Sequence, residues 1–118
     1  PYSRLTKKEC SGYPLFNLSL KDLTRNIHAS EVQLGKAPIM VDGEVKLNQE
    51  CLVTAGDYVC TVTGTGHKIS EAREDCYDRI KSKIEIPNSI MYRTDIGCRL
   101  EDQLPELRIN GYCTDLRY

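Results

Sequence analysis

The sequence is poor in tryptophan, phenylalanine and histidine. It has no tryptophan, one phenylalanine and only two histidines, His28 and His67. Two histidines cannot make a zinc site alone, and no two cysteines form a Cys-x-x-Cys pair. The 16 basic and 17 acidic residues give a net charge of −1, so charge offers no basis for binding nucleic acid or an anionic membrane. No apolar run approaches the ~20 residues of a membrane-spanning helix.

The length and the cysteines bound the class of protein. We expect the 118 residues, 1–118, to form one domain, which at this size buries about two-thirds of the surface exposed in the unfolded chain. Such a domain does not need disulfides, and Cys60 and Cys76 fall where small core side chains are expected. We therefore predict six reduced thiols and a cytoplasmic protein. The start at Pro1 favours a fragment of a larger product.

The clearest local pattern lies between Asp57 and Ile84 and predicts a strand, a glycine turn and a helix. Residues 58–63 are β-branched or aromatic, as in strands, and Gly64-Thr65-Gly66 ends the run. Ser70 offers a hydroxyl as a helix cap, and acidic residues follow in the first turn. Four apolar side chains recur every four residues: Ala72, Cys76, Ile80 and Ile84. The spacing predicts a main helix at about 70–84.

The other predicted elements are short. Asp42-Gly43 between β-prone segments predicts a hairpin. Short strands are expected at 28–34, 51–53, 90–93 and 107–109, and a short helix within 15–27. Turns or loops are expected at 12–14, 35–36, 48–50 and 101–105. The sum predicts an α+β fold with a small, mostly antiparallel sheet.

Two motifs are candidates for binding. Gly64-Thr65-Gly66-His67-Lys68 lies before the helix but lacks the adjacent Gly-Lys-Ser/Thr of a nucleotide loop, so we favour a tight turn over an anion site. Arg93 and Asp95 lie two apart on an expected strand and can share a face. Their guanidinium and carboxylate could bind a phosphate-bearing substrate or could pin the strand end, and we favour pinning. No residue is assigned a catalytic role, and none is assigned to a metal or cofactor.

Several segments together resemble a known family. They are Gly12-Tyr13-Pro14, His28-Ala29-Ser30, the Asp42-Gly43 hairpin, residues 56–66, Ile69-Ser70-Glu71-Ala72-Arg73, Cys76-Tyr77 and Tyr92-Arg93-Thr94-Asp95-Ile96-Gly97. This succession resembles the C-terminal domain of phosphoribosylamine–glycine ligase, also called glycinamide ribonucleotide synthetase. The sequence departs from the family pattern at Ser30, Asp57 and Thr94.

The resemblance implies a fold, a pathway and partners. It implies a partial barrel-sandwich hybrid with one helix, at the end of a larger ATP-grasp ligase. That enzyme uses ATP and Mg²⁺ to join glycine to phosphoribosylamine in purine synthesis, and both cofactors would bind outside this chain. The partners would be the N-terminal and ATP-grasp domains of the same parent chain. His28, Arg93 and Asp95 become candidates for contact with substrate.

We therefore interpret the chain as the C-terminal domain of this ligase, inactive alone. One rival is a stand-alone module that holds an anion at the strand–turn–helix. The other is a small secreted domain with disulfides.

Overall fold

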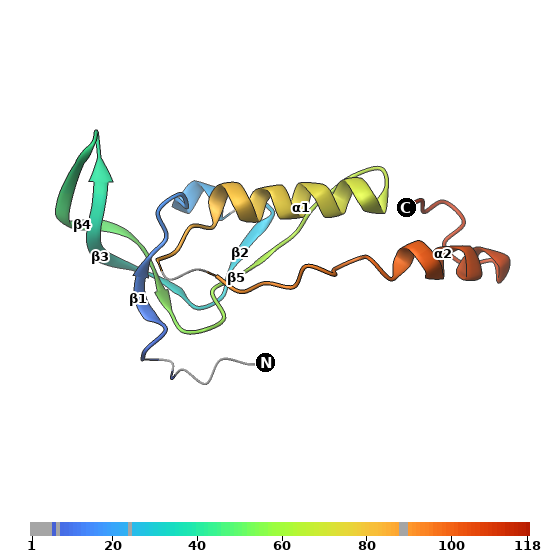
Figure 1. Cartoon of the computed structure of the whole chain (residues 1–118), viewed down its shortest axis with the longest axis horizontal. Helices are drawn as coiled ribbons and strands as arrows, with labels where there is room; N and C mark the ends of the chain where they lie inside the picture. Colours follow the sequence, from blue (N-terminus) through green and yellow to red (C-terminus); the bar gives the residue numbers. More distant parts are fainter. Residues whose placement is uncertain (1–5, 7, 24, 88–89) are drawn as a thin grey trace.

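The chain folds into two small antiparallel sheets and two helices, described here from a computed structural model for residues 6, 8–23, 25–87 and 90–118. The molecule is elongated, with extents of 59 × 33 × 20 Å. Its elements in chain order are β1 Ser11–Pro14, the 3₁₀ turn η1 Leu20–Asp22, β2 Ile27–Ala29, β3 Val32–Val41, β4 Glu44–Ala55, β5 Cys60–Val62, α1 Ile69–Lys83 and α2 Leu100–Ile109. Figure 1 shows the β3–β4 arm at one end, α1 in the middle and α2 at the other end.

The sheets confirm the predicted α+β class. One sheet has the order β1-β4-β3 and the other pairs β2 with β5, and every pairing is antiparallel. In the part of the chain that the structure describes, these strands do not close into a barrel. The segment expected as one strand at 28–34 is divided between the two sheets, because the chain bends at Ser30 and Glu31. The amides of both residues donate to carbonyls just before β5.

The hairpin at Asp42-Gly43 is confirmed. Both residues have positive φ angles, 51° and 81°, and this pair of angles lets a two-residue turn follow the twist of the flanking strands. Val41 and Glu44 are the paired residues that close the turn. The hairpin forms an arm, defined here as residues 32–55.

Two predictions within the arm are wrong. The expected turn at 35–36 and the expected loop at 48–50 both lie within strands. A Cβ on Gly35 would lie 2.7 Å from a methyl of Val53, so this glycine makes room for a neighbouring strand rather than for a turn. Asn48 has a φ of 54° and lies in a bulge, where the pairing shifts opposite Pro38. Since proline cannot donate to a strand ladder, the bulge accommodates it and the strand continues.

Two other predictions near the N-terminus change as well. The expected turn at 12–14 is strand β1, which is irregular because Gly12 has a φ of 90°. The expected helix within 15–27 is reduced to the single turn η1, in which Ser19 and Asp22 form a reciprocal capping box.

Helix α1 matches its prediction within one residue at each end and covers the core. Ile80 and Ile84 are buried, and Ile84 packs with Leu15, Leu18, Ile27 and Leu52. The cap differs from the expectation. Lys68 is the N-cap residue, and the Ser70 side chain makes no capping bond.

The C-terminal region is the largest correction. The predicted loop at 101–105 and strand at 107–109 form one helix, α2. Leu100, Leu104 and Leu107 lie on one face, and Leu104 is only 2% exposed. Pro105 lies inside α2, and the helix tolerates it at the cost of one backbone hydrogen bond.

Candidate functional site

The segment 90–97, called the strap here, runs along α1 without joining a sheet (Figure 1), so the predicted strand at 90–93 is wrong. Side chains of α1 hold it by its backbone. Arg73 donates through Nε to the carbonyl of Ile96 at 3.0 Å and through Nη2 to that of Thr94 at 2.8 Å. Tyr77 donates its hydroxyl proton to the carbonyl of Arg93 at 2.7 Å and accepts from the amide of Ile96 at 3.2 Å.

Ring contacts add to these bonds. The Tyr77 and Tyr92 rings lie with centroids 6.0 Å apart and an angle of 40° between their planes. The guanidinium carbon of Arg73 lies 5.1 Å from the centre of the Tyr77 ring, within range of a cation–π interaction. The strap is therefore fixed to α1 by Arg73 and Tyr77, two side chains to which the sequence analysis gave no role.

Arg93 and Asp95 face one another, as predicted. The Arg93 Nε donates to Asp95 Oδ1 at 2.9 Å, and Nη2 donates to Oδ2 at 2.7 Å. This hydrogen bonding lowers the pKa of the Asp95 carboxyl below its ordinary value and raises the pKa of Arg93. Both side chains are exposed, at 70% and 56%, so the pair is worth little to stability. Within the described residues, Arg93 Nη1 makes no hydrogen bond.

His28, the third candidate, lies elsewhere. It is in the middle of β2, opposite Thr61 of β5, and its side chain is exposed. No hydrogen bond or ion pair within the described ranges joins it to Arg93 or Asp95. The structure therefore brings two of the three candidates together and leaves His28 apart.

The glycine loop 64–68 has little room for an anion, because the helix itself fills the site. The amide of Thr65 donates to Asp75 Oδ2 at 2.9 Å, and the amide of His67 donates to Glu71 Oε2 at 3.0 Å. A Cβ on Gly64 would collide with the backbone of α1. The loop is thus a close strand–helix contact, as the tight-turn interpretation expects, and its amides already bind carboxylates.

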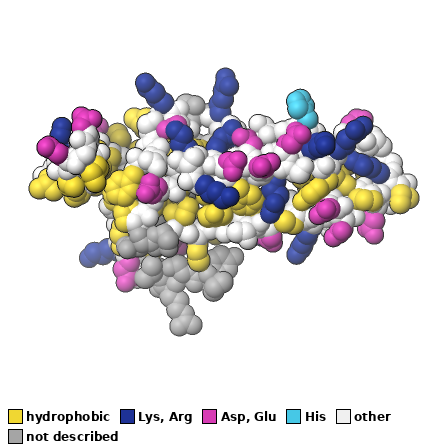
Figure 2. Space-filling model, turned by 45° about the horizontal axis from the view of Figure 1, so that its top comes forward, with side chains coloured by type: hydrophobic (Ala, Val, Ile, Leu, Met, Phe, Trp, Pro, Cys, Tyr) yellow, Lys and Arg dark blue, Asp and Glu magenta, His cyan; other side chains and the backbone are white. Residues whose placement is uncertain are grey.

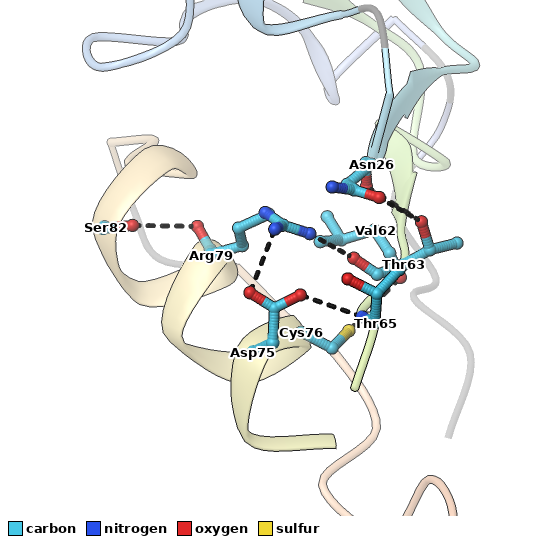
Figure 3. A network of polar contacts seen from close by, with 8 residues as sticks. All are labelled: Asn26, Val62, Thr63, Thr65, Asp75, Cys76, Arg79 and Ser82. Atoms are coloured by element: carbon cyan, nitrogen blue, oxygen red, sulfur yellow. Dashed lines mark hydrogen bonds and ion pairs between the residues drawn. The ribbon is translucent and has the colours of Figure 1, made fainter. Parts of the chain in front are cut away.

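Figure 3 shows a polar network that fastens this loop and β2 to α1. Arg79 is its centre: Nη1 donates to the carbonyl of Thr63 at 2.9 Å, and Nη2 pairs with Asp75 at 2.9 Å. With its amide oriented to satisfy both partners, Asn26 accepts from Arg79 through its side-chain oxygen. The sequence analysis assigned Arg79 to no site. No sequence signal pointed to Asn26, which is 53 positions away by its number.

The described residues contain neither a candidate metal site nor a membrane-spanning helix. Across residues 6, 8–23, 25–87 and 90–118, no group of three or more His, Cys, Asp and Glu side chains is placed to hold a metal ion. None of the helices in these ranges is long and apolar enough to cross a membrane. All six cysteines are free thiols.

Comparison with known proteins gives one family. The family model described as "Phosphoribosylglycinamide synthetase, C domain" matches residues 10–99. The match includes both sheets, α1 and the strap, and it ends just before α2. Searches against curated proteins and against solved structures gave no match.

Proposed function

The chain belongs to the phosphoribosylglycinamide synthetase C-domain family, a ligase family of purine biosynthesis, and on that premise we propose that it completes the active site of a phosphoribosylamine–glycine ligase. The parent enzyme, in the cytoplasm, joins glycine to 5-phosphoribosylamine with ATP and Mg²⁺. Both cofactors bind to parts of the enzyme outside this chain. The observation on which the proposal rests is the family match over residues 10–99.

In this proposal the domain helps to position the substrates and contributes no catalytic residue. A ligase that makes an acyl phosphate must hold a carboxyl group, a phosphate donor and an amine together and must exclude water. The strap suits this task because the side chains of Arg73 and Tyr77 fix its backbone to a helix. The side chains of Arg93 and Asp95 then project outward from a rigid support.

Because of the geometry of the strap, we propose that Arg93 contacts the substrate and does not serve only to fix the strap. The bond that fastens this residue to α1 uses its carbonyl, and the guanidinium meets only Asp95 among the described residues. Asp95 holds the guanidinium in one orientation and leaves Nη1 for an anionic group. A guanidinium oriented in this way suits the phosphate of phosphoribosylamine.

The arm is the surface that we propose docks on the ATP-grasp core. Met40, Val45 and Leu47 are 67%, 63% and 69% exposed. Met40 and Val45 line a groove of about 1020 Å³, together with Phe16 and Leu34 among other residues. Figure 2 shows hydrophobic side chains gathered at this end of the molecule. An exposed apolar surface of this extent is typical of a contact between protein parts.

The two rivals have less support. A module that holds an anion at the glycine loop would need the amides of Thr65 and His67, which bind Asp75 and Glu71. A secreted disulfide domain would need paired cysteines, and all six thiols are free.

The test uses the full-length parent enzyme with Arg93→Lys. We expect an unchanged melting temperature and a fall in kcat/KM for phosphoribosylamine of about tenfold or more, because lysine cannot reproduce the oriented fork. Arg108→Lys, an exposed change on α2, is the matched control and should leave both quantities unchanged. A variant with normal kinetics would refute the contact with substrate.

The activity of the isolated chain tests the rest of the proposal. We expect no release of phosphate from ATP by this chain alone in the presence of glycine and phosphoribosylamine. Turnover that requires both substrates would show that the chain holds its own ATP site and would overturn the proposal.

A further inference from the structure

A second polar site lies away from the strap, where η1 and the chain entering β2 meet the last turns of α1. It is a pocket of about 220 Å³, with the buried side chain of Ile27 among its lining residues. Four cationic side chains surround it, together with one carboxylate and one amide: Lys21, Arg25, Arg79, Lys83, Asp22 and Asn26. A quarter of the 16 basic residues of a chain with net charge −1 thus meet at one small pocket.

The charges at this pocket are only partly matched. Lys83 Nζ lies 3.2 Å from Asp22 Oδ1, and hydrogen bonds from Ser19 and Lys83 lower the pKa of Asp22, which keeps that carboxylate ionised. Arg79 is paired with Asp75. Arg25 makes no hydrogen bond or ion pair with any residue that the structure describes. Among the described residues, the Arg25 guanidinium therefore remains an unmatched positive charge at the pocket.

Helix stability alone does not explain this cluster. Arg79 and Lys83 lie in the last turns of α1, where cations suit the helix dipole. Lys21 and Arg25 come from a different part of the chain, and bringing them beside two other cations costs energy through repulsion. A bound anion would remove that repulsion.

We propose that this pocket binds a small molecule bearing a phosphate monoester, through Lys21, Arg25 and Lys83. A phosphate group supplies the negative charge that the unmatched guanidinium of Arg25 lacks, and its oxygens can accept from that guanidinium and from the ammonium groups of Lys21 and Lys83. Arg79 binds no ligand atom in this proposal. The carbonyl of Thr63 and the carboxylate of Asp75 fix its guanidinium, so it contributes a fixed positive field (Figure 3).

The inference does not depend on the proposed ligase function. The strap is held by Arg73 and Tyr77, and none of the strap residues is among those that line this pocket. Phosphate binding here could therefore be found even if the Arg93 test fails, and the reverse also holds.

The experiment is an NMR titration of the full chain with inorganic phosphate and with glycerol 3-phosphate, at constant ionic strength set with sodium chloride. We expect saturable shifts of the amides around residues 21, 25 and 83, with half-saturation at about 1–10 mM, a range that corresponds to a modest binding free energy. Glycerol 3-phosphate should bind at least as tightly as inorganic phosphate.

The variants decide whether the site is specific. Arg25→Gln removes an exposed cation with no described partner, so the fold should persist and half-saturation should rise about tenfold. Lys46→Gln, an exposed change on the arm, should leave it unchanged. Shifts that follow ionic strength alone, or that are equal in Arg25→Gln, would overturn the site. Binding of inorganic phosphate without glycerol 3-phosphate would overturn the monoester as ligand.

Discussion

Gly64→Ala is the sharpest test of how the loop meets α1. The added Cβ would lie 2.6 Å from the amide nitrogen of Cys76 and closer still to the carbonyl oxygen of Ala72. Both are backbone atoms of a helix, so no change of rotamer can make room. The loop and β5 must move away from α1, although Gly64 itself does not have the left-handed backbone angle that often requires glycine.

The expected loss in the free energy of unfolding comes from overpacking and from the hydrogen bonds that this movement lengthens. Overpacking against a rigid neighbour costs about 1–3 kcal/mol. The displacement would also lengthen the bond from Arg79 Nη1 to Thr63 O at 2.9 Å and the bond from the Thr65 amide to Asp75 at 2.9 Å, and bonds to charged groups are worth about 1.5–3 kcal/mol each. With partial loss of both, we expect a fall of about 3 kcal/mol in the free energy of unfolding. For a domain of this size, the melting temperature should fall by roughly 12 °C.

Urea denaturation followed by far-ultraviolet circular dichroism measures this change, and an unchanged m-value would show that the comparison is sound. Gly111→Ala is the matched control. Gly111 has a φ of 81° and nothing within 4 Å of an added Cβ, so it should lose only the ~1 kcal/mol of the backbone angle. If Gly64→Ala unfolds within about 0.5 kcal/mol of the unchanged protein, the close contact between loop and helix is wrong.

Three other changes test separate parts of the fold. Cys76→Asp should lower the free energy of unfolding by about 1–3 kcal/mol, because it places a charge at the half-buried contact between Cys76 Sγ and the Val62 carbonyl, whereas the exposed Cys113→Asp should change little. Equal effects in urea melts would mean that α1 faces another way. Leu104→Ala should lower the melting temperature through loss of a buried side chain at a cost of about 2–5 kcal/mol, and an unchanged value would show that α2 is not packed. Folding lowers the pKa of the Asp22 carboxyl, so this group stabilises the fold at pH values above the pKa that it has in the unfolded chain. This stabilisation is lost as the pH falls through the pKa of Asp22 in the folded chain. Asp22→Asn should therefore flatten the loss of stability at acidic pH below about 4, and an unaltered acid titration would contradict the capping box.

The sequence predicted the elements whose signals are local. The stripe ending in Ile80 and Ile84 and the Asp42-Gly43 turn need only neighbouring residues, and the structure has both. The expected turn at Gly35 failed because the reason for that glycine is Val53, on the neighbouring strand. The strand continues through Asn48 for the same kind of reason, since Asn48 lies in a bulge where the pairing shifts opposite Pro38.

The C-terminal half shows a different error. Leu100, Leu104 and Leu107 carry a helical spacing that is visible in the sequence, but the segment was interpreted as a loop at 101–105 and a strand at 107–109. At the candidate site, the contact of Arg93 with Asp95 could be predicted because the two are close in sequence, although the strand expected to carry them is absent. The contacts of Arg73 and Tyr77 with the strap could not, since they join residues about 20 positions apart through backbone carbonyls that look alike in any sequence.

One bond sets an order of events during synthesis. The first amide of α1, on Ile69, donates to the carbonyl of Arg117 at 2.8 Å. At 5–20 residues per second, the ribosome makes that acceptor roughly 2–10 seconds after the donor. Until then water must satisfy this end of the helix. The start of α1 therefore gains this partner only after the sheets and α1 have been synthesised.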